Sequence, residues 1–358
     1  MQTGFLPGLP SLPRVLQPDS PSEPLTSPSA LAEWASENQT WLDEELLRYG
    51  ALLFRGFAVT TEEEFQAIAS QFVRDFGDYK GGTSPRTRVS GAVSTSTDMA
   101  QFVPIPLHLE MSYFDEYPRR ILFFCKTPPK EGGQTPLADM RAFYADLNPD
   151  VRATLEERGI RLIQNIPNKR SRLRPSTRPW PEMFGWDKEA AAAYCAQHGI
   201  DASWNPNGSM RLIARRPVSI LHPGTGERIW FGPVYGHDSF SWELDRVGKR
   251  LAAWYTRMGE KRRRGKVVEE MPYQVTYGDG TEIPIKDVEY LRRTLWEHAI
   301  LFDWQQGDVL VLDNSRIAHG RMPYKGARRI RAALSESIPV VAAPRVEERA
   351  RIAPEITV

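Results

Sequence analysis

The sequence has few of the features that mark several large classes of protein. Its 358 residues include 2 cysteines, Cys125 and Cys195, which are too few for a disulfide framework. No window approaches the roughly 18 to 20 continuous apolar residues of a membrane span. We find neither a Gly-rich dinucleotide motif after a strand nor the run of cysteines that an iron–sulfur cluster needs. These absences favour a protein of the reducing cytoplasm.

An excess of charge of one sign is also lacking. The 46 basic and 45 acidic side chains leave a net charge of +1, which argues against bulk attraction to nucleic acid or to an anionic membrane. Two local stretches are basic, residues 161–178 and the KRRRGK segment at 261–266. Because no nucleic-acid recognition motif accompanies them, we do not expect a nucleic-acid partner. A basic cover over an acidic small molecule, or a landing surface for an acidic carrier protein, fits better.

Proline, by contrast, is concentrated at the N-terminus. Seven of the first 28 residues are prolines, and no basic segment followed by an unbroken apolar stretch precedes them, so we expect neither a signal peptide nor an anchor. Proline fixes φ and removes a backbone donor, which predicts an extended arm over residues 1–28 without ladder or helix hydrogen bonds. We expect one domain over residues 29–340, with an insert at about 165–285, and a tail over 341–358.

The body of the chain alternates between a few helical segments and many short β-rich segments. Apolar spacing, capping residues and closing glycines predict helices over 29–50, 60–77, 141–159, 185–202 and 285–298. Short apolar runs bounded by Gly and Pro predict strands over 51–57, 87–97, 105–111, 119–126, 159–166, 210–222, 228–234, 308–314 and 328–337. Many short strands with few long helices among them favour a mainly β sandwich or barrel with flanking helices.

The segment PLHLEMSY places His108 and Glu110 two positions apart. In an extended strand these two side chains share a face, with Leu109 turned away. Alone, the pair would most often be a hydrogen-bonded couple at a sheet edge. A second histidine, His319, follows the buried strand DVLVLDN. Two histidines and one carboxylate can hold Fe(II) on one face of an octahedron and leave three positions open.

An iron site that uses oxygen needs a source of electrons, and a small keto acid bound to the metal could supply them. The far carboxylate of such a molecule needs a planar, permanently charged partner, which arginine provides through a bidentate pair. Arg329 lies ten residues beyond His319 and has the required reach, and Arg331 lies on the same face of the strand.

Four motifs in order carry a resemblance to a known family: the H-x-E at His108, EGGQT ending at Thr135, WQQGDVLVLDN, and HGRMPYKGARRI. Together they resemble the Fe(II)- and 2-oxoglutarate-dependent oxygenases of the taurine dioxygenase type, and within these the clavaminate synthase-like branch, which has glutamate in place of aspartate. The resemblance implies a double-stranded β-helix, or jelly roll, and the use of Fe(II), 2-oxoglutarate and O2. It implies metal ligation by His108, Glu110 and His319, with Thr135 and Arg329 beside the 2-oxoglutarate carboxylate.

The resemblance also bears on the substrate. An arginine that holds the sulfonate in taurine dioxygenase falls at Ala333, so taurine is not the expected substrate, and Glu110 stands where related halogenases have a small residue. Hydroxylation of an amino acid, free or tethered to a carrier protein, is the leading interpretation. Desaturation or cyclisation, a non-oxidative metal-binding jelly roll, and a nucleic-acid or protein demethylase stay open, as does the oligomeric state. Residues that we expect at the substrate are Arg86, Met111, Tyr113 and Trp230.

Overall fold

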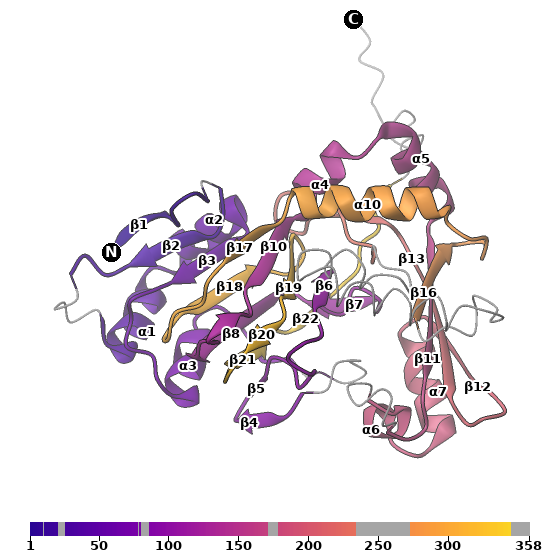
Figure 1. Cartoon of the computed structure of the whole chain (residues 1–358), viewed down its shortest axis with the longest axis horizontal. Coiled ribbons are helices and arrows are strands. Elements are labelled where there is room, and N and C mark those ends of the chain that lie inside the picture. The colour runs from indigo at the N-terminus through magenta and orange to yellow at the C-terminus, as the bar shows by residue number, and fades with distance from the viewer. Residues whose placement is uncertain are drawn as a thin grey trace, which may run out of the picture.

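Two β-sheets that face each other form the centre of the computed structural model (Figure 1), which describes residues 1–9, 11–20, 26–77, 79, 86–170, 178–233 and 273–344. The larger sheet has eight strands, in the order β1 (Gln2–Phe5), β2 (Arg14–Gln17), β3 (Ala51–Phe54), β18 (Val309–Asp313), β8 (Arg120–Thr127), β21 (Arg329–Leu334), β5 (Val93–Thr95) and β4 (Arg88–Ser90). The smaller sheet has four, in the order β17 (Ile300–Phe302), β10 (Thr135–Asp139), β19 (Ile317–Arg321) and β6 (Ile105–His108). This arrangement is the predicted double-stranded β-helix.

Strand β18 shows why the sequence places the larger sheet in the interior. Its side chains alternate between the two faces, so Leu310 and Leu312 point into the core between the two sheets, and Val309 and Val311 point to the outer face. All four are fully buried. A strand that is covered on both faces reads as a continuous apolar run, and DVLVLDN has that character.

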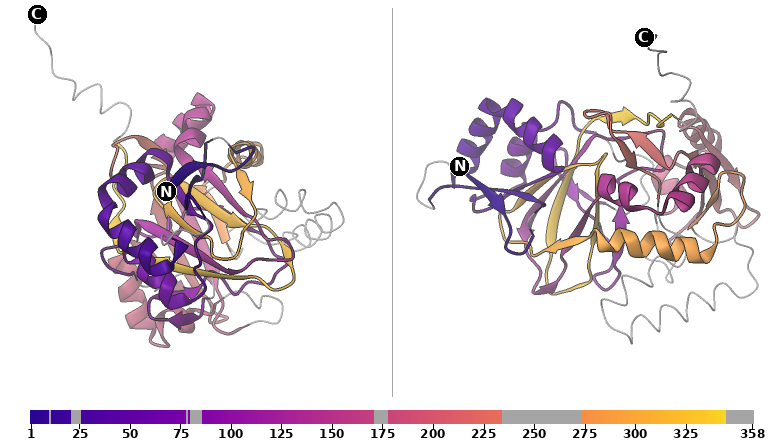
Figure 2. Two further views of the ribbon diagram at one scale, coloured as in Figure 1. Left: turned by 90° about the vertical axis from the view of Figure 1, so that its left-hand side faces the viewer. Right: turned by 90° about the horizontal axis from the view of Figure 1, so that it is seen from above.

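Three helices cover the outer face of the larger sheet: α1 (Pro28–Glu37), α2 (Gln39–Tyr49) and α3 (Glu62–Ala69). Figure 2 shows them grouped at the N-terminal end of the molecule. The sequence predicts one helix over 29–50, but Asn38 divides it. The Asn38 side chain donates to the carbonyl of Trp34 at 2.8 Å and so competes with the helical backbone bonds. Helix α3 begins at a capping box of Thr61 and Glu64, as its sequence predicts, but ends before residue 77.

The predicted helix over 141–159 is also two helices, α4 (Met140–Asp146) and α5 (Pro149–Arg158). Proline disfavours a helical conformation in the residue before it, and Asn148, which is in that position, instead caps α5 with its side chain. The remaining short strands pair as β7 (Glu116–Pro118) with β22 (Ser337–Pro339), and β9 (Glu131–Gly132) with β20 (Tyr324–Lys325).

A third sheet lies in the described part of the predicted insert, with β11 at its start, and we call it the insert sheet. Its order is β12 (Ile200–Trp204), β13 (Met210–Arg216), β11 (Ile160–Ile166) and β16 (Tyr273–Tyr277). Helices α6 (Trp180–Phe184) and α7 (Lys188–Gln197), the hairpin of β14 (Ser219–Leu221) and β15 (Arg228–Trp230), and α10 (Ile285–Glu297) complete this region. Figure 1 shows the insert sheet on the side of the jelly roll away from α1 to α3. Residues 234–272, with KRRRGK, lie outside the described residues, and closure of the insert over the metal stays a prediction.

The N-terminal segment corrects one expectation. Residues 1–28 are largely extended, but two short strands within them take part in the larger sheet, since β1 pairs with β2 and β2 runs parallel to β3. The four-residue strands fit between the prolines, which therefore do not prevent ladder bonds. None of the described helices is long and apolar enough to cross a bilayer.

Candidate active site

The three predicted metal ligands converge in the structure. His108, Glu110 and His319 each offer a ligand atom, and these atoms lie within 4.8 Å of one another. The histidines come together because β6 and β19 are antiparallel neighbours with His108 directly opposite His319, and their rings are 4.5 Å apart. The sheet register thus joins an early and a late part of the chain at one site.

Glu110 reaches the site by a route that strand alternation does not describe. Strand β6 ends at His108, and Glu110 lies in the following turn, where Met111 adopts a left-handed φ of 59°. The backbone N–H of Glu110 donates to the side-chain oxygen of Asn314 at 2.8 Å, and the Glu110 carbonyl accepts from the Asn314 amide at 3.0 Å. His108 and Glu110 do point to one site, as predicted. The reason is not strand alternation, however, because Glu110 lies outside the strand.

Both histidines are in states that suit metal coordination. Nδ1 of His108 lies 2.8 Å from the carbonyl of Pro106, which can only accept, so Nδ1 carries the proton and Nε2 keeps its lone pair. Burial, then the nearby His108 and Arg86, holds the pKa of His319 well below its usual range, which keeps the ring neutral. Nδ1 of His319 is buried without a hydrogen-bond partner among the described residues. Two neutral imidazoles and one carboxylate fit Fe(II).

Arg86 lies against Glu110, the acidic candidate ligand. Its guanidinium forms an ion pair with Oε2 of Glu110 and stacks over the ring of Tyr79 at 4.2 Å. Burial opposes the charge on Arg86, but the adjacent Glu110 outweighs this effect and raises the arginine pKa. Arg86 was expected to hold a carboxylate of the substrate, whereas in the structure it holds a carboxylate of the protein.

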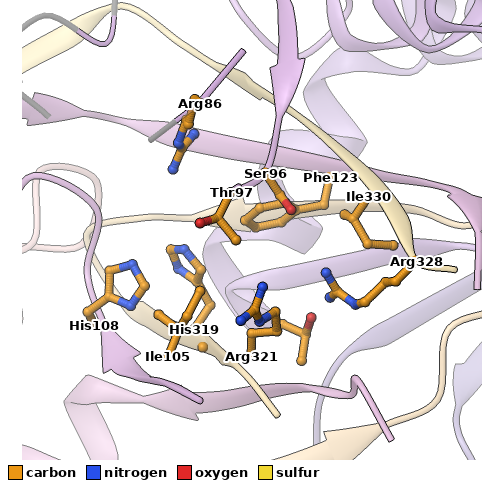
Figure 3. Close-up of a pocket in the computed structure, with 12 residues that line it drawn as sticks. Arg86, Ser96, Thr97, Ile105, His108, Phe123, His319, Arg321, Arg328 and Ile330 are labelled. Atoms are coloured by element: carbon orange, nitrogen blue, oxygen red, sulfur yellow. The ribbon is translucent and has the colours of Figure 1, made fainter. Parts of the chain in front are cut away.

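A pocket opens beside the two histidines (Figure 3), with about 440 Å³ of space that no atom fills. The residues that line it are Arg86, Ser96, Thr97, Ile105, His108, Phe123, Thr135, His319, Gly320, Arg321, Arg328 and Ile330. Three of these are arginines, and none is acidic. Figure 3 shows Arg321 and Arg328 beside each other, while Arg86 approaches His319 from another element. The pocket is therefore suited to anions.

The structure places Arg329, the predicted partner of 2-oxoglutarate, outside the pocket. Arg329 is exposed, while Arg328 is the residue that lines the pocket. Strand alternation explains the difference, because Ile330 points into the core between the sheets and residues two positions apart share a face. Arg331 lies on the other face, where it donates to Glu62 at 2.7 Å. The apolar Ile330 was the available sign that Arg328, and not Arg329, faces inward.

Arg328 is a half-buried cation with few hydrogen bonds. Within the described part of the chain, its one hydrogen bond runs from Nε to the carbonyl of Gly133, at 3.1 Å. Burial, then the charge of Arg321, lowers the pKa of Arg328 to about 10, which still leaves it charged at neutral pH. Thr135 lines the same pocket, as expected, and its hydroxyl accepts from Nε1 of Trp304 at 3.0 Å.

Arg321 is a pocket residue that sequence reasoning missed. Its guanidinium donates to the carbonyls of Met99, Ala100 and Val103 at 2.6 to 3.0 Å, and burial lowers its pKa to about 10. It thereby fixes the loop beside the pocket. Its position two residues after His319 in the same strand was the only sequence sign of its role.

Three predicted substrate contacts lie away from this pocket. Met111 and Trp230 are buried in the core beneath the insert sheet, and the indole of Trp230 packs edge-on against Phe143 at 5.4 Å. Tyr113 lines a separate small cavity against the insert sheet with Phe114. The expectation for Met111 and Trp230 is corrected, because both fill the apolar core and neither lines the pocket.

Comparison with known proteins identifies the chemistry of such a site. The model of the "Taurine catabolism dioxygenase TauD, TfdA family" matches residues 19–334. The chain belongs to this family. A clavaminate synthase-like protein of Arabidopsis thaliana is 30% identical over 329 residues, which cover 90% of this chain and 93% of the relative. The dapdiamide synthesis protein DdaC of Enterobacter agglomerans is 28% identical over 314 residues, covering 87% and 89%.

Solved structures agree on the fold. A chain described as a putative alpha-ketoglutarate-dependent taurine dioxygenase from Burkholderia xenovorans has a TM-score of 0.51 at 16% identity, covering 96% of this chain and 99% of that one. PvcB, described as an Fe, alpha-ketoglutarate dependent oxygenase from an isonitrile synthetic pathway, has a TM-score of 0.51 at 15% identity, covering 92% and 89%. As a member of the TauD family, the chain is an oxygenase that uses Fe(II), 2-oxoglutarate (also called alpha-ketoglutarate) and O2, and a non-oxidative metal-binding role is set aside.

Proposed function

We propose that this oxygenase hydroxylates an unactivated C–H bond of a small amino acid whose carboxylate is free. The observation that carries the proposal is the charge of the pocket, with Arg86, Arg321 and Arg328 and no acid among its lining residues. The similarity to a dapdiamide synthesis protein supports a place in specialised metabolism.

The residues of the site divide into two groups by role. His108, Glu110 and His319 would hold the metal, and Arg328 would pair with the far carboxylate of 2-oxoglutarate, with the Thr135 hydroxyl beside it. Fe(II), when bound, would activate O2 with electrons from 2-oxoglutarate, so that one oxygen atom enters the substrate and the other enters succinate, with release of CO2. Arg321 keeps the adjacent loop in place through its three carbonyl bonds.

A count of charges supports a substrate that carries a carboxylate. The metal carries two positive charges, and Glu110 with the two carboxylates of 2-oxoglutarate carries three negative ones. The three arginines of the lining then leave an excess of positive charge in a largely buried site. Buried charges need partners because desolvation is costly. A substrate carboxylate would give the arginines a negatively charged partner. An amino acid tethered as a thioester would not, because its carboxyl group is no longer charged.

The alternative outcomes have less support. Desaturation and cyclisation use the same ligands, so they differ from hydroxylation only in the product. A demethylase that acts on nucleic acid rests on the basic stretches, yet Arg170 is paired with Glu182 at 2.8 Å and most of the rest lies outside the described residues. We also infer that the enzyme works in the reducing cytoplasm, since Cys125 and Cys195 are both free thiols.

The proposal is tested by anaerobic titration followed by turnover. The protein should bind about one Fe(II) per chain, and 2-oxoglutarate should then produce a weak visible charge-transfer band that His108→Ala and His319→Ala abolish. A panel of free amino acids should next be compared with the matching amino acid amides by succinate release and product mass. We expect release, and a product heavier by one oxygen atom, with a free amino acid only. Equal stimulation of succinate release by the amide would contradict the requirement for a free carboxylate. A product lighter by two hydrogen atoms would indicate desaturation.

A further inference from the structure

Glu110 reaches the metal site from a segment that no strand ladder holds. Strand β6 ends two residues earlier, at His108, and the chain then turns through the left-handed Met111, with the N–H of Phe114 donating to the Met111 carbonyl at 3.0 Å. The position of the Glu110 carboxylate therefore depends on the contacts that hold the backbone N–H and C=O of Glu110.

The side chain of Asn314 supplies that fixation. Its oxygen accepts from the Glu110 N–H at 2.8 Å, and its amide nitrogen donates to the Glu110 carbonyl at 3.0 Å. Bonding to both the N–H and the C=O of one residue is what an opposite residue provides in an antiparallel ladder. The amide nitrogen makes a further bond to the carbonyl of Pro118 at 2.8 Å. One donor and two acceptors around the group fix which end is oxygen, because a flipped amide would oppose all three.

Asn314 is also held firmly in its own place. It is fully buried at the end of β18, and its neighbour Asp313 accepts from Nε2 of His222 at 2.8 Å. Nδ1 of His222 accepts a hydrogen bond from the backbone N–H of Gly224 at 3.1 Å, so its proton is on Nε2 and faces Asp313. Because Asn314 is fixed by the large sheet, its carboxamide can also fix the backbone of Glu110, which lies outside any strand.

We propose that Asn314 is a positioning residue that sets the place of Glu110 at the metal by holding the backbone of Glu110. This rests on the proposed role of Glu110 as a ligand. Partners that orient ligands typically change metal affinity about ten- to a hundredfold when they are removed. Arg86 holds the carboxylate end of the same residue, so the two contacts act on different parts of Glu110.

The test measures Co(II) binding to the folded protein by its visible absorption, without turnover. Asn314→Ala should weaken Co(II) binding by about ten- to a hundredfold. Tyr117→Phe is the matched control, because it removes a buried hydrogen bond, the 3.2 Å contact with Ser315, that does not involve Glu110. It should lower the stability but leave the Co(II) affinity within about twofold, since a bond away from the ligands does not orient them.

A double-mutant cycle separates positioning from general damage. In the Glu110→Ala background, Asn314→Ala should cause no further loss of Co(II) affinity, because its effect acts through Glu110. An unchanged affinity in Asn314→Ala, or an equal loss in the Glu110→Ala background, would overturn the inference and leave the metal site intact. Failure of the wild-type protein to bind Co(II) would overturn both. If Asn314→Ala does not fold, Asn314→Ser takes its place in the same comparison.

Discussion

Arg329 is the first residue of β21 and Arg328 directly precedes it, and the two side chains have different surroundings. Arg328 lines the pocket, and Arg329 is exposed. Arg328→Ala should raise the KM for 2-oxoglutarate more than tenfold, because loss of a buried partner of a carboxylate costs about 2 to 5 kcal/mol. Fe(II) binding should be nearly intact, since Arg328 is not among the metal ligands.

Arg329→Ala is the matched control for this prediction. It removes the same charge one position away and should change the KM by less than about twofold, as exposed charges contribute little. Steady-state measurement of 2-oxoglutarate consumption checks both variants. A large effect in Arg329→Ala with none in Arg328→Ala would reverse the assignment.

At this scale the sequence identifies chemical groups better than it identifies their geometry. The candidate ligands His108, Glu110 and His319 were predicted from residue type, order and the family resemblance, and the structure brings them together. The route of Glu110 was not predicted, because a left-handed residue after a strand end leaves no clear sign in the sequence. The choice between Arg328 and its neighbour failed by one position, and in a strand one position changes the face.

At the scale of elements, helix α3 is joined to the larger sheet through one acid. Glu62 accepts from Arg331 of β21 at 2.7 Å and from Lys126 of β8 at 2.5 Å. Burial by itself raises the pKa of Glu62, but the hydrogen bonds from Lys126 and Arg331 outweigh it, and the net shift is downward from 4.5. A carboxyl with a lower pKa in the folded state stabilises that state above its unfolded pKa, and this contribution is lost as pH falls through the folded pKa.

Glu62→Gln should therefore lower the free energy of unfolding at pH 7 by roughly 1.5 to 3 kcal/mol, the usual worth of hydrogen bonds to a charged group. The difference from wild type should shrink as the pH falls below 4.5, where wild-type Glu62 gains its proton. Urea unfolding at several pH values measures this, with the exposed neighbour Glu63→Gln as control. A difference that stays constant with pH would show that the charge of Glu62 does not contribute.

Elements were predictable where the local pattern and the tertiary environment agree. Strand β18 reads as a buried strand because both of its faces are covered, and α10 fills the helix predicted over 285–298. Helix α7 is shorter than the helix predicted over 185–202, because the last residues of that range belong to β12. Helix lengths were overestimated where a polar side chain interrupts the backbone bonds, as Asn38 does between α1 and α2. A helix-length pattern does not show such a competition, because asparagine is also found within helices.

For the whole molecule, the N-terminal strands are structural parts of the jelly roll. Leu16 in β2 is fully buried under α1 to α3, while its neighbour Gln17 is exposed. Leu16→Ala should lower the free energy of unfolding by about 2 to 5 kcal/mol, through lost burial and the cavity that is left. Gln17→Ala should change it by less than about 0.5 kcal/mol.

Urea unfolding at neutral pH checks the pair of variants. If Leu16→Ala were as stable as Gln17→Ala, residues 14–17 would contribute little to the stability of the jelly roll. The proline count predicted an extended chain, but it could not predict pairing with β3, because parallel partners far apart in sequence share no local pattern.

The pairing of His108 with His319 also has a consequence for how the protein is made. During synthesis on the ribosome, His108 and Glu110 emerge long before the strand that carries His319, and Glu110 and its partner Asn314 are 204 positions apart. Until that late strand folds back onto β6, a nascent chain offers iron only two of its three ligands. The complete three-residue site therefore forms only after β19 has been synthesised and has paired with β6.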